Sequence, residues 1–124
     1  MKNYPINKYL EGASPIAFGC MGLGGGWSNE PAGSKEVDQA HQAIDASLES
    51  GINFFDHADI YTLGKAEQVF GEVLKERPSL RSQMYIQSKC AIRFDDENAP
   101  KRYDFSPEWI ERPVDNILKR LNVE

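Results

Sequence analysis

Apolar residues at helical spacing mark three segments of this chain, and short apolar runs precede each of them. Residues 34–50 carry Val37, Ile44 and Leu48 on one stripe, and Gly51 follows as a helix terminator. Residues 65–76 show the same pattern with Val69, Phe70, Val73 and Leu74. The spacing therefore predicts helices over both segments.

The apolar runs have the length and composition of buried strands. They are Ile16-Ala17-Phe18, residues 52–56 and residues 84–89. Before the first run, Ile6 to Leu10 followed by the turn signal Glu11-Gly12 predicts a short hairpin over residues 6–20 that leads into the strand. The alternation of strands and helices predicts three βα units with a parallel sheet.

The third helix is expected after a polar loop over residues 91–105. Ser106 is a suitable N-cap, Pro107 suits the first helical position, and Glu108 lies near the positive end of the helix. Pro113 interrupts the pattern, because proline removes a backbone hydrogen bond at a cost of roughly 3 kcal/mol. We therefore expect a third helix from residue 106 onward that Pro113 disturbs.

Residues suited to acid–base chemistry lie at the ends of the second and third predicted strands. Asp56 ends one strand, Tyr61 follows five positions later, and Lys89 ends the next strand, 33 positions after Asp56. The ends of neighbouring parallel strands lie roughly 5 Å apart, so Asp56 and Lys89 can pair. A phenol with the ordinary pKa of about 10 is a poor acid at neutral pH, and a neighbouring cation makes it a better one. The three residues indicate an acid-catalysis device, against the simpler interpretation of a structural ion pair and an ordinary loop aromatic.

Two other interpretations of the motifs are weaker. The stretch 22–26 is rich in glycine, but Trp27 replaces the third glycine of a dinucleotide-binding fingerprint and about eight loop residues precede the helix. Asp56, His57 and Asp59 offer metal-binding groups, but adjacent strand residues point to opposite sides. We therefore predict no metal site. We also expect Lys65 to be a solvated charge at a helix start, Glu67 a first-turn carboxylate, and residues 93–102 a solvated loop.

Composition restricts the class of protein. The chain is 40% hydrophobic and 27% charged, with a net charge of −5. An acidic balance argues against nucleic-acid and anionic-membrane partners, and no apolar run approaches the roughly 20 residues of a membrane span. Two cysteines, Cys20 and Cys90, do not make a disulfide framework, which favours reduced thiols and a cytoplasmic location.

Three motifs together resemble the aldo-keto reductase family. They are Asp56-His57-Ala58-Asp59-Ile60-Tyr61, Phe70-Gly71-Glu72-Val73-Leu74 and Ser88-Lys89-Cys90. The resemblance extends from about Ile16 onward, and Ala91 stands where the most similar branch usually has glycine. It implies an α/β fold, the N-terminal portion of a (β/α)₈ TIM barrel.

The resemblance also implies roles for individual residues. Tyr61 would protonate the carbonyl of an aldehyde or ketone, while Lys89 and Asp56 tune the tyrosine. Hydride would come from NADPH, with NAD not excluded, and Cys20, Met21 and Asp56 would contact the cofactor. The partner would thus be a small carbonyl substrate.

Length sets this chain apart from the family it resembles. A (β/α)₈ barrel typically needs about 250 residues, whereas this chain has 124. We expect one partial barrel domain, 1–124, that ends before the strand carrying the family's catalytic histidine, and we expect the 124 residues alone to be inactive. His41 and His57 are not expected to substitute. The alternative is a non-catalytic binding or regulatory protein, or an inactive remnant, on the same scaffold.

Overall fold

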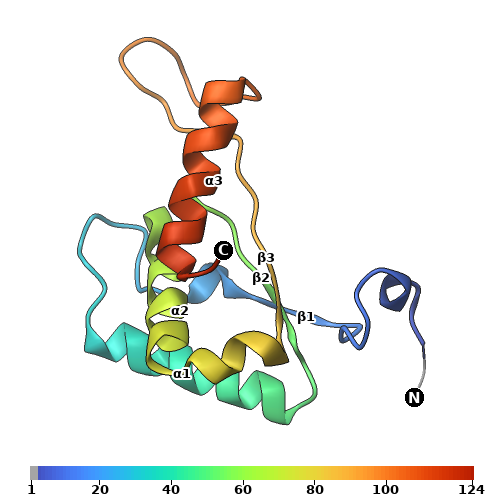
Figure 1. Ribbon diagram of the computed structural model, residues 1–124. Coiled ribbons are helices and arrows are strands. Elements are labelled where there is room, and N and C mark those ends of the chain that lie inside the picture. Colours follow the sequence, from blue (N-terminus) through green and yellow to red (C-terminus); the bar gives the residue numbers. More distant parts are fainter. Residues whose placement is uncertain (1–2) are drawn as a thin grey trace.

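The computed structural model describes residues 3–124, and a three-stranded parallel sheet is its centre (Figure 1). The strands are β1 (Ala17–Gly19), β2 (Phe54–Asp56) and β3 (Tyr85–Gln87), in the order β1-β2-β3. Gly19 lies opposite Asp56, and Asp56 lies opposite Gln87. The three strands therefore end together at one edge of the sheet, as the predicted βα units require.

Three helices connect or follow the strands. They are α1 (Ser34–Glu49), α2 (Lys65–Glu76) and α3 (Pro107–Leu121), and α2 packs against both of the others (Figure 1). Gly51 adopts the left-handed conformation (φ 78°) just after α1, and the Ser106 hydroxyl accepts a hydrogen bond from the Trp109 amide at the start of α3. The first two helix predictions are confirmed to within one residue of their ends, and the predicted start of the third is confirmed as well.

The core lies between the sheet and α2. Phe55 from the central strand is fully buried, with its ring centroid 5.2 Å from that of Phe70 on α2 and 6.0 Å from that of Phe18 on β1. Burying each such side chain contributes roughly 1.5–3 kcal/mol. The central strand and α2 thus form the most solvent-shielded part of the chain, directly beneath the strand ends.

Gly71 allows α3 to approach α2 more closely than any side chain would permit. A Cβ atom added at Gly71 would lie 1.8 Å from the backbone oxygen of Arg120. The side-chain amide of Asn122 also donates to the Gly71 carbonyl (3.0 Å). The last turn of α3 therefore rests directly on the middle of α2.

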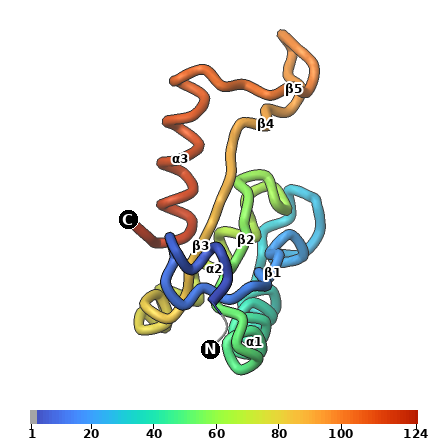
Figure 2. The backbone as a smooth tube through the Cα atoms, turned by 90° about the vertical axis from the view of Figure 1, so that its right-hand side faces the viewer, coloured from blue at the N-terminus to red at the C-terminus, as the bar shows by residue number. Residues whose placement is uncertain are grey.

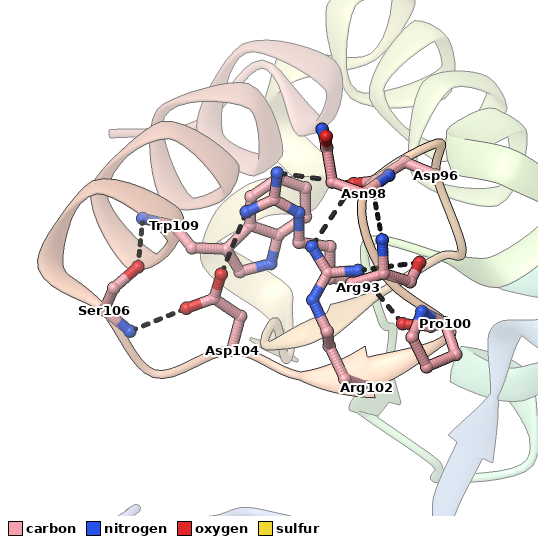
Figure 3. A network of polar contacts seen from close by, with 9 residues as sticks. Arg93, Asp96, Asn98, Pro100, Arg102, Asp104, Ser106 and Trp109 are labelled. Carbon is pink, nitrogen blue, oxygen red and sulfur yellow. Dashed lines mark hydrogen bonds and ion pairs between the residues drawn. The ribbon is translucent and has the colours of Figure 1, made fainter.

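The segment between β3 and α3 is more ordered than a solvated loop. It contains β4 (Ile92–Arg93) paired antiparallel with β5 (Arg102–Tyr103), and it extends away from the sheet (Figure 2). Arg93 and Arg102 bind the carboxylates of Asp96 and Asp104 across the segment (Figure 3). Sequence alone predicted only polarity here, and the ion pairs supply the order.

The predicted N-terminal hairpin is wrong. Residues Pro5–Lys8 form a short 3₁₀-helix, η1, and residues 6–20 contain no antiparallel pair. Pro5 has no N–H to offer a strand partner and suits the first helical position. The Asn7 side chain accepts from the Tyr4 amide (2.9 Å) and donates to the Ala13 carbonyl (2.8 Å), so local contacts satisfy the backbone.

Pro113 does not end the third helix. α3 runs unbroken from Pro107 to Leu121, with Pro113 inside it and buried. Proline removes its own amide from the helical ladder and crowds the carbonyl four residues earlier, a cost that the rest of the helix has to offset. Buried apolar residues on the same helix, Ile117 and Leu121, hold the second half in place.

Three further 3₁₀-helices occupy the connections. They are η2 (Cys20–Gly22), η3 (Tyr61–Gly64) and η4 (Pro78–Gln83). The first two begin directly after β1 and shortly after β2, at the edge where the strands end. This edge carries the candidate site.

Candidate active site

Asp56 and Lys89 form an ion pair at the ends of adjacent parallel strands. The Lys89 ammonium donates to both carboxylate oxygens of Asp56, at 2.8 and 2.9 Å. β2 and β3 are direct neighbours in the sheet. The predicted pairing of these two residues is confirmed.

The surroundings of Lys89 fix the direction of its side chain. Its Nζ also donates to the His57 carbonyl (2.6 Å) and lies 5.1 Å from the centroid of the Tyr61 ring. Partial burial works to lower the pKa of Lys89, but the Asp56 carboxylate and the Tyr61 hydroxyl outweigh it and raise this pKa above its ordinary value. Lys89 is therefore a permanent cation beside the phenol ring.

Tyr61 begins a tightly wound turn. The next three residues, Thr62, Leu63 and Gly64, all have left-handed backbone angles, with φ of 46°, 59° and 91°. Such angles are unfavourable for residues other than glycine and persist where the surroundings enforce them. The buried Thr62 hydroxyl donates to the Leu23 carbonyl (2.8 Å), which ties the tyrosine turn to the glycine-rich loop.

Lys65 anchors the same loop, and the expectation of a solvated charge is wrong. Only 8% of Lys65 is exposed, and its ammonium donates to the carbonyls of Gly26 (2.8 Å) and Glu30 (3.0 Å). Gly24, at φ 86°, passes so close to Lys65 that an added Cβ would lie 2.7 Å from its backbone. The loop after β1 therefore packs onto the start of α2.

Cys20 and Met21 follow β1 at the same edge of the sheet. Cys20 is fully buried, and burial, followed by the nearby Asp56 carboxylate, raises the pKa of its thiol to about 12. Its side chain is thus a neutral thiol at physiological pH, and no part of Cys20 is exposed to a bound molecule. Met21 is 56% exposed and offers an apolar surface.

Gln87 belongs to the same cluster, although sequence reasoning did not select it. Its amide donates to the Asp56 carboxylate at 2.6 Å. Residues 87 and 89 lie on one face of a strand because side chains alternate. That alternation was available in the sequence as a signal for Gln87.

Neither histidine lies at the site. His57 is fully buried, and burial lowers its pKa to about 4, so it is neutral at physiological pH. Its ring packs edge-on against Phe70 (4.6 Å between centroids), on the side of the strand away from Asp56. His41 lies on α1 and contacts the Glu76 carboxylate at 2.7 Å.

Two kinds of feature are absent from residues 3–124. Within that range, no group of three or more histidine, cysteine or acidic side chains is placed to hold a metal ion. In the same part of the chain, every helix is too short or too polar to cross a membrane.

Comparison with known proteins gives one family. The family model described as "Aldo/keto reductase family" matches residues 15–124. The 6-dehydroglucose reductase of Novosphingobium aromaticivorans is 36% identical over 117 residues, which cover 90% of this chain and 34% of that protein. The aldo-keto reductase yakc [NADP(+)] of Schizosaccharomyces pombe is 30% identical over 109 residues, covering 88% of this chain and 30% of its own.

Solved structures agree with this match. The aldo-keto reductase AKR11C1 from Bacillus halodurans, in its holo form, superposes with a TM-score of 0.66 at 32% identity, over 90% of this chain and 33% of that one. The present chain thus spans about a third of the length of the relatives it matches. The three βα units correspond to the N-terminal portion of a (β/α)₈ barrel.

Proposed function

The chain belongs to the aldo/keto reductase family, and on this premise we propose that it forms the N-terminal part of an oxidoreductase that reduces an aldehyde or ketone to an alcohol with NADPH. The observation that supports this most is the contact between Asp56, Lys89 and the ring of Tyr61 at the carboxyl ends of β2 and β3. Active sites of (β/α)₈ barrels lie at this end of the strands. NADPH is the preferred cofactor because the relative from S. pombe carries NADP(+) in its name.

Tyr61 is the proposed proton donor. As the carbonyl oxygen gains negative charge, the phenol gives it a proton and becomes a phenolate. The Lys89 ammonium stabilises that phenolate electrostatically, because its centre lies 5.1 Å from the ring. Both carboxylate oxygens of Asp56 accept from the Lys89 ammonium, so the ammonium does not have to reorient during the reaction.

The residues around β1 fit a nicotinamide ring. Met21 exposes an apolar side chain directly after the strand, and Gly19 is the register partner of Asp56. We propose that Met21 packs on the ring and that Asp56 lies at its edge, whereas Cys20 has no exposed surface for such a contact. When bound, NADPH supplies the hydride that adds to the carbonyl carbon, while this chain supplies the proton.

For the 124 residues on their own we propose no turnover. Their two histidines lie away from the site, His57 beneath the sheet edge and His41 on α1. No histidine among the described residues is therefore placed to orient a carbonyl. The two free cysteines, Cys20 and Cys90, are compatible with the reducing, cytoplasmic location that we also propose.

The test uses a chimera in which this chain replaces the matching third of the N. aromaticivorans reductase, which is 36% identical to it. We expect NADPH-dependent reduction of an aldehyde panel. Tyr61→Phe should lower kcat by about 10²–10⁴-fold, the usual contribution of general acid catalysis, with NADPH affinity by fluorescence quenching nearly unchanged. Lys89→Met should cause a comparable loss.

The matched control is Tyr103→Phe, because Tyr103 is 72% exposed in the β5 segment. It should leave the rate unchanged. A Tyr61→Phe chimera that reduces aldehydes at the unsubstituted rate would assign the proton to another group. The chain alone should consume NADPH no faster than its own Tyr61→Phe variant.

A further inference from the structure

A fully buried carboxylate lies directly beneath the site. Glu67, on the first turn of α2, has no exposed surface, and each of its two oxygens has its own partner. Oε2 accepts from Nε (2.8 Å) and Nη2 (2.7 Å) of Arg120, while Oε1 accepts from the Ser88 hydroxyl (2.6 Å). A buried charge is tolerated only when it is paired and hydrogen-bonded, so these contacts fix the position of Glu67.

Ser88 stands between two residues of the site. Gln87 and Lys89 both bind the Asp56 carboxylate, on one face of the chain, whereas the Ser88 hydroxyl reaches α2 on the other face. Side chains alternate along an extended segment, so holding residue 88 toward the helix keeps 87 and 89 turned to the opposite side. Ser88 and Lys89 follow Gln87, the last residue of β3. The backbone amide of Asp59 donates to the Lys89 carbonyl (3.0 Å), so hydrogen bonding between the two neighbouring segments continues past the end of β3.

The neighbouring strand is held in the same way. His57 follows Asp56, and its buried ring packs on Phe70 of α2. Glu67 and Phe70 are three positions apart and so share one face of the helix. One face of α2 therefore contacts the residue next to each member of the Asp56–Lys89 pair.

We propose that Glu67 and Ser88 are positioning residues for this ion pair. Glu67, anchored by Arg120, holds the Ser88 hydroxyl, and that hydrogen bond keeps Lys89 turned toward Asp56 and Tyr61. Sequence reasoning treated Glu67 only as a first-turn charge. The catalytic meaning of this arrangement rests on the proposed function, but the positioning itself is a property of the chain and is measured without turnover.

The experiment follows the Lys89 ammonium by NMR in the isotope-labelled 124-residue chain during a pH titration. In the unsubstituted chain the pKa of Lys89 should lie above that of an ordinary lysine, and Asp56→Asn should remove this increase. In Ser88→Ala the pKa of Lys89 should move toward the value that it has in Asp56→Asn. Hydrogen exchange of the Asp59 amide should become about tenfold faster, as expected for the loss of one hydrogen bond.

Three controls separate positioning from general stability. Ser88→Thr restores the hydroxyl and should restore both readouts. Ser82→Ala removes an exposed serine hydroxyl that donates locally to Ser79 and should change neither. Ser88→Cys keeps nearly the same side-chain volume but has only a weak S–H donor. It should therefore shift both readouts in the same direction as Ser88→Ala, by a smaller amount. It also replaces Ser88→Ala if that variant does not fold.

An unchanged Lys89 titration and unchanged Asp59 exchange in a folded Ser88→Ala or Ser88→Cys chain would overturn the proposal. That result differs from a failure of the proposed function. If Tyr61→Phe retained full activity in the chimera while the Ser88 variants still shifted Lys89, only the role of Tyr61 would fall.

Discussion

Two of the polar networks in this chain have similar chemistry but connect residues at very different sequence separations. Behind the strand ends, Glu67 joins Arg120, 53 positions away, to Ser88, 21 positions away. In the segment between β3 and α3, Arg93 and Arg102 join Asp96 and Asp104 over 3 to 11 positions (Figure 3). The first network connects α2, α3 and the residues just after β3, and the second shapes one segment.

Solvent exposure explains why these networks have different consequences. Glu67 has no exposed side-chain surface, whereas every partner in the β4–β5 segment keeps between 19% and 34% of its side chain exposed. Water and salt screen exposed pairs, so they contribute little to global stability. A buried carboxylate without its partner is strongly unfavourable. The same kind of ion pair is therefore essential to the fold at Glu67 and orders only its own segment between β3 and α3.

Removing Arg120 should have the largest effect on stability. Arg120→Met leaves Glu67 buried without a cation and also removes the cation that lowers the pKa of Asp59, which burial and Glu67 raise. We expect the free energy of unfolding in urea to fall by about 3–4 kcal/mol. Exposed Lys119, on the same turn of α3, supplies the control Lys119→Met, which should change little. The double variant Glu67→Leu/Arg120→Met should recover part of the loss, and a single variant as stable as the control would contradict this account.

His57 should make the same region sensitive to acid. Its pKa is about 4 in the folded chain against 6.5 in the unfolded one, so below pH 6.5 the unfolded state binds a proton that the folded state does not. Stability from this group is complete above pH 6.5 and is lost as pH falls toward 4, by at most about 3 kcal/mol at 1.36 kcal/mol per pKa unit.

The check for His57 is urea unfolding at several pH values beside His57→Leu. The difference in free energy of unfolding between the unsubstituted chain and His57→Leu should vary between pH 6.5 and 4 and be constant above pH 7. A constant difference across the whole range would show that His57 has the same pKa in the folded and unfolded states.

Gly71 tests the contact that brings Arg120 to Glu67. In Gly71→Ala the new methyl group would meet the Arg120 carbonyl, so α3 must move away from α2. Overpacking of this kind costs about 1–3 kcal/mol, in spite of the better helix propensity of alanine. Gly26→Ala is the control, because a Cβ there has nothing within 4 Å. Equal thermal midpoints for the two variants would disprove the close approach.

Asp104 should show the smallest and most local effect. The amide and hydroxyl of Ser106, followed by the Arg93 guanidinium, hold the pKa of Asp104 at about 2. Its stabilising contribution is present above pH 4 and is lost as pH falls through 2. Asp104→Asn should accelerate hydrogen exchange of the Ser106 amide, and about 1 M salt should reproduce part of the change. A shift of the global unfolding midpoint as large as that of Gly71→Ala would mean that this segment is part of the core.

Much of the fold and of the pair at its edge was predictable from local pattern. Three helices appear where apolar spacing and terminal residues placed them, and Asp56 meets Lys89 because parallel neighbouring strands end at one edge. The N-terminal hairpin failed as a prediction because Pro5 and the Asn7 side chain form a local 3₁₀-helix, which apolar content alone does not reveal. The remaining site residues depended on contacts that no local pattern encodes.

Local sequence pattern sets the order of the elements, the parallel sheet and the positions of Asp56, Tyr61 and Lys89, because side-chain periodicity and strand direction follow from covalent geometry. Tertiary structure alone decided the burial of Lys65 and Glu67, which look like ordinary first-turn charges of α2. The partners of those two residues, loop carbonyls and Arg120, come from segments 35 to 53 positions away. Whether a charge is solvated or structural depends on what packs over it, and packing is fixed only when the distant segments meet.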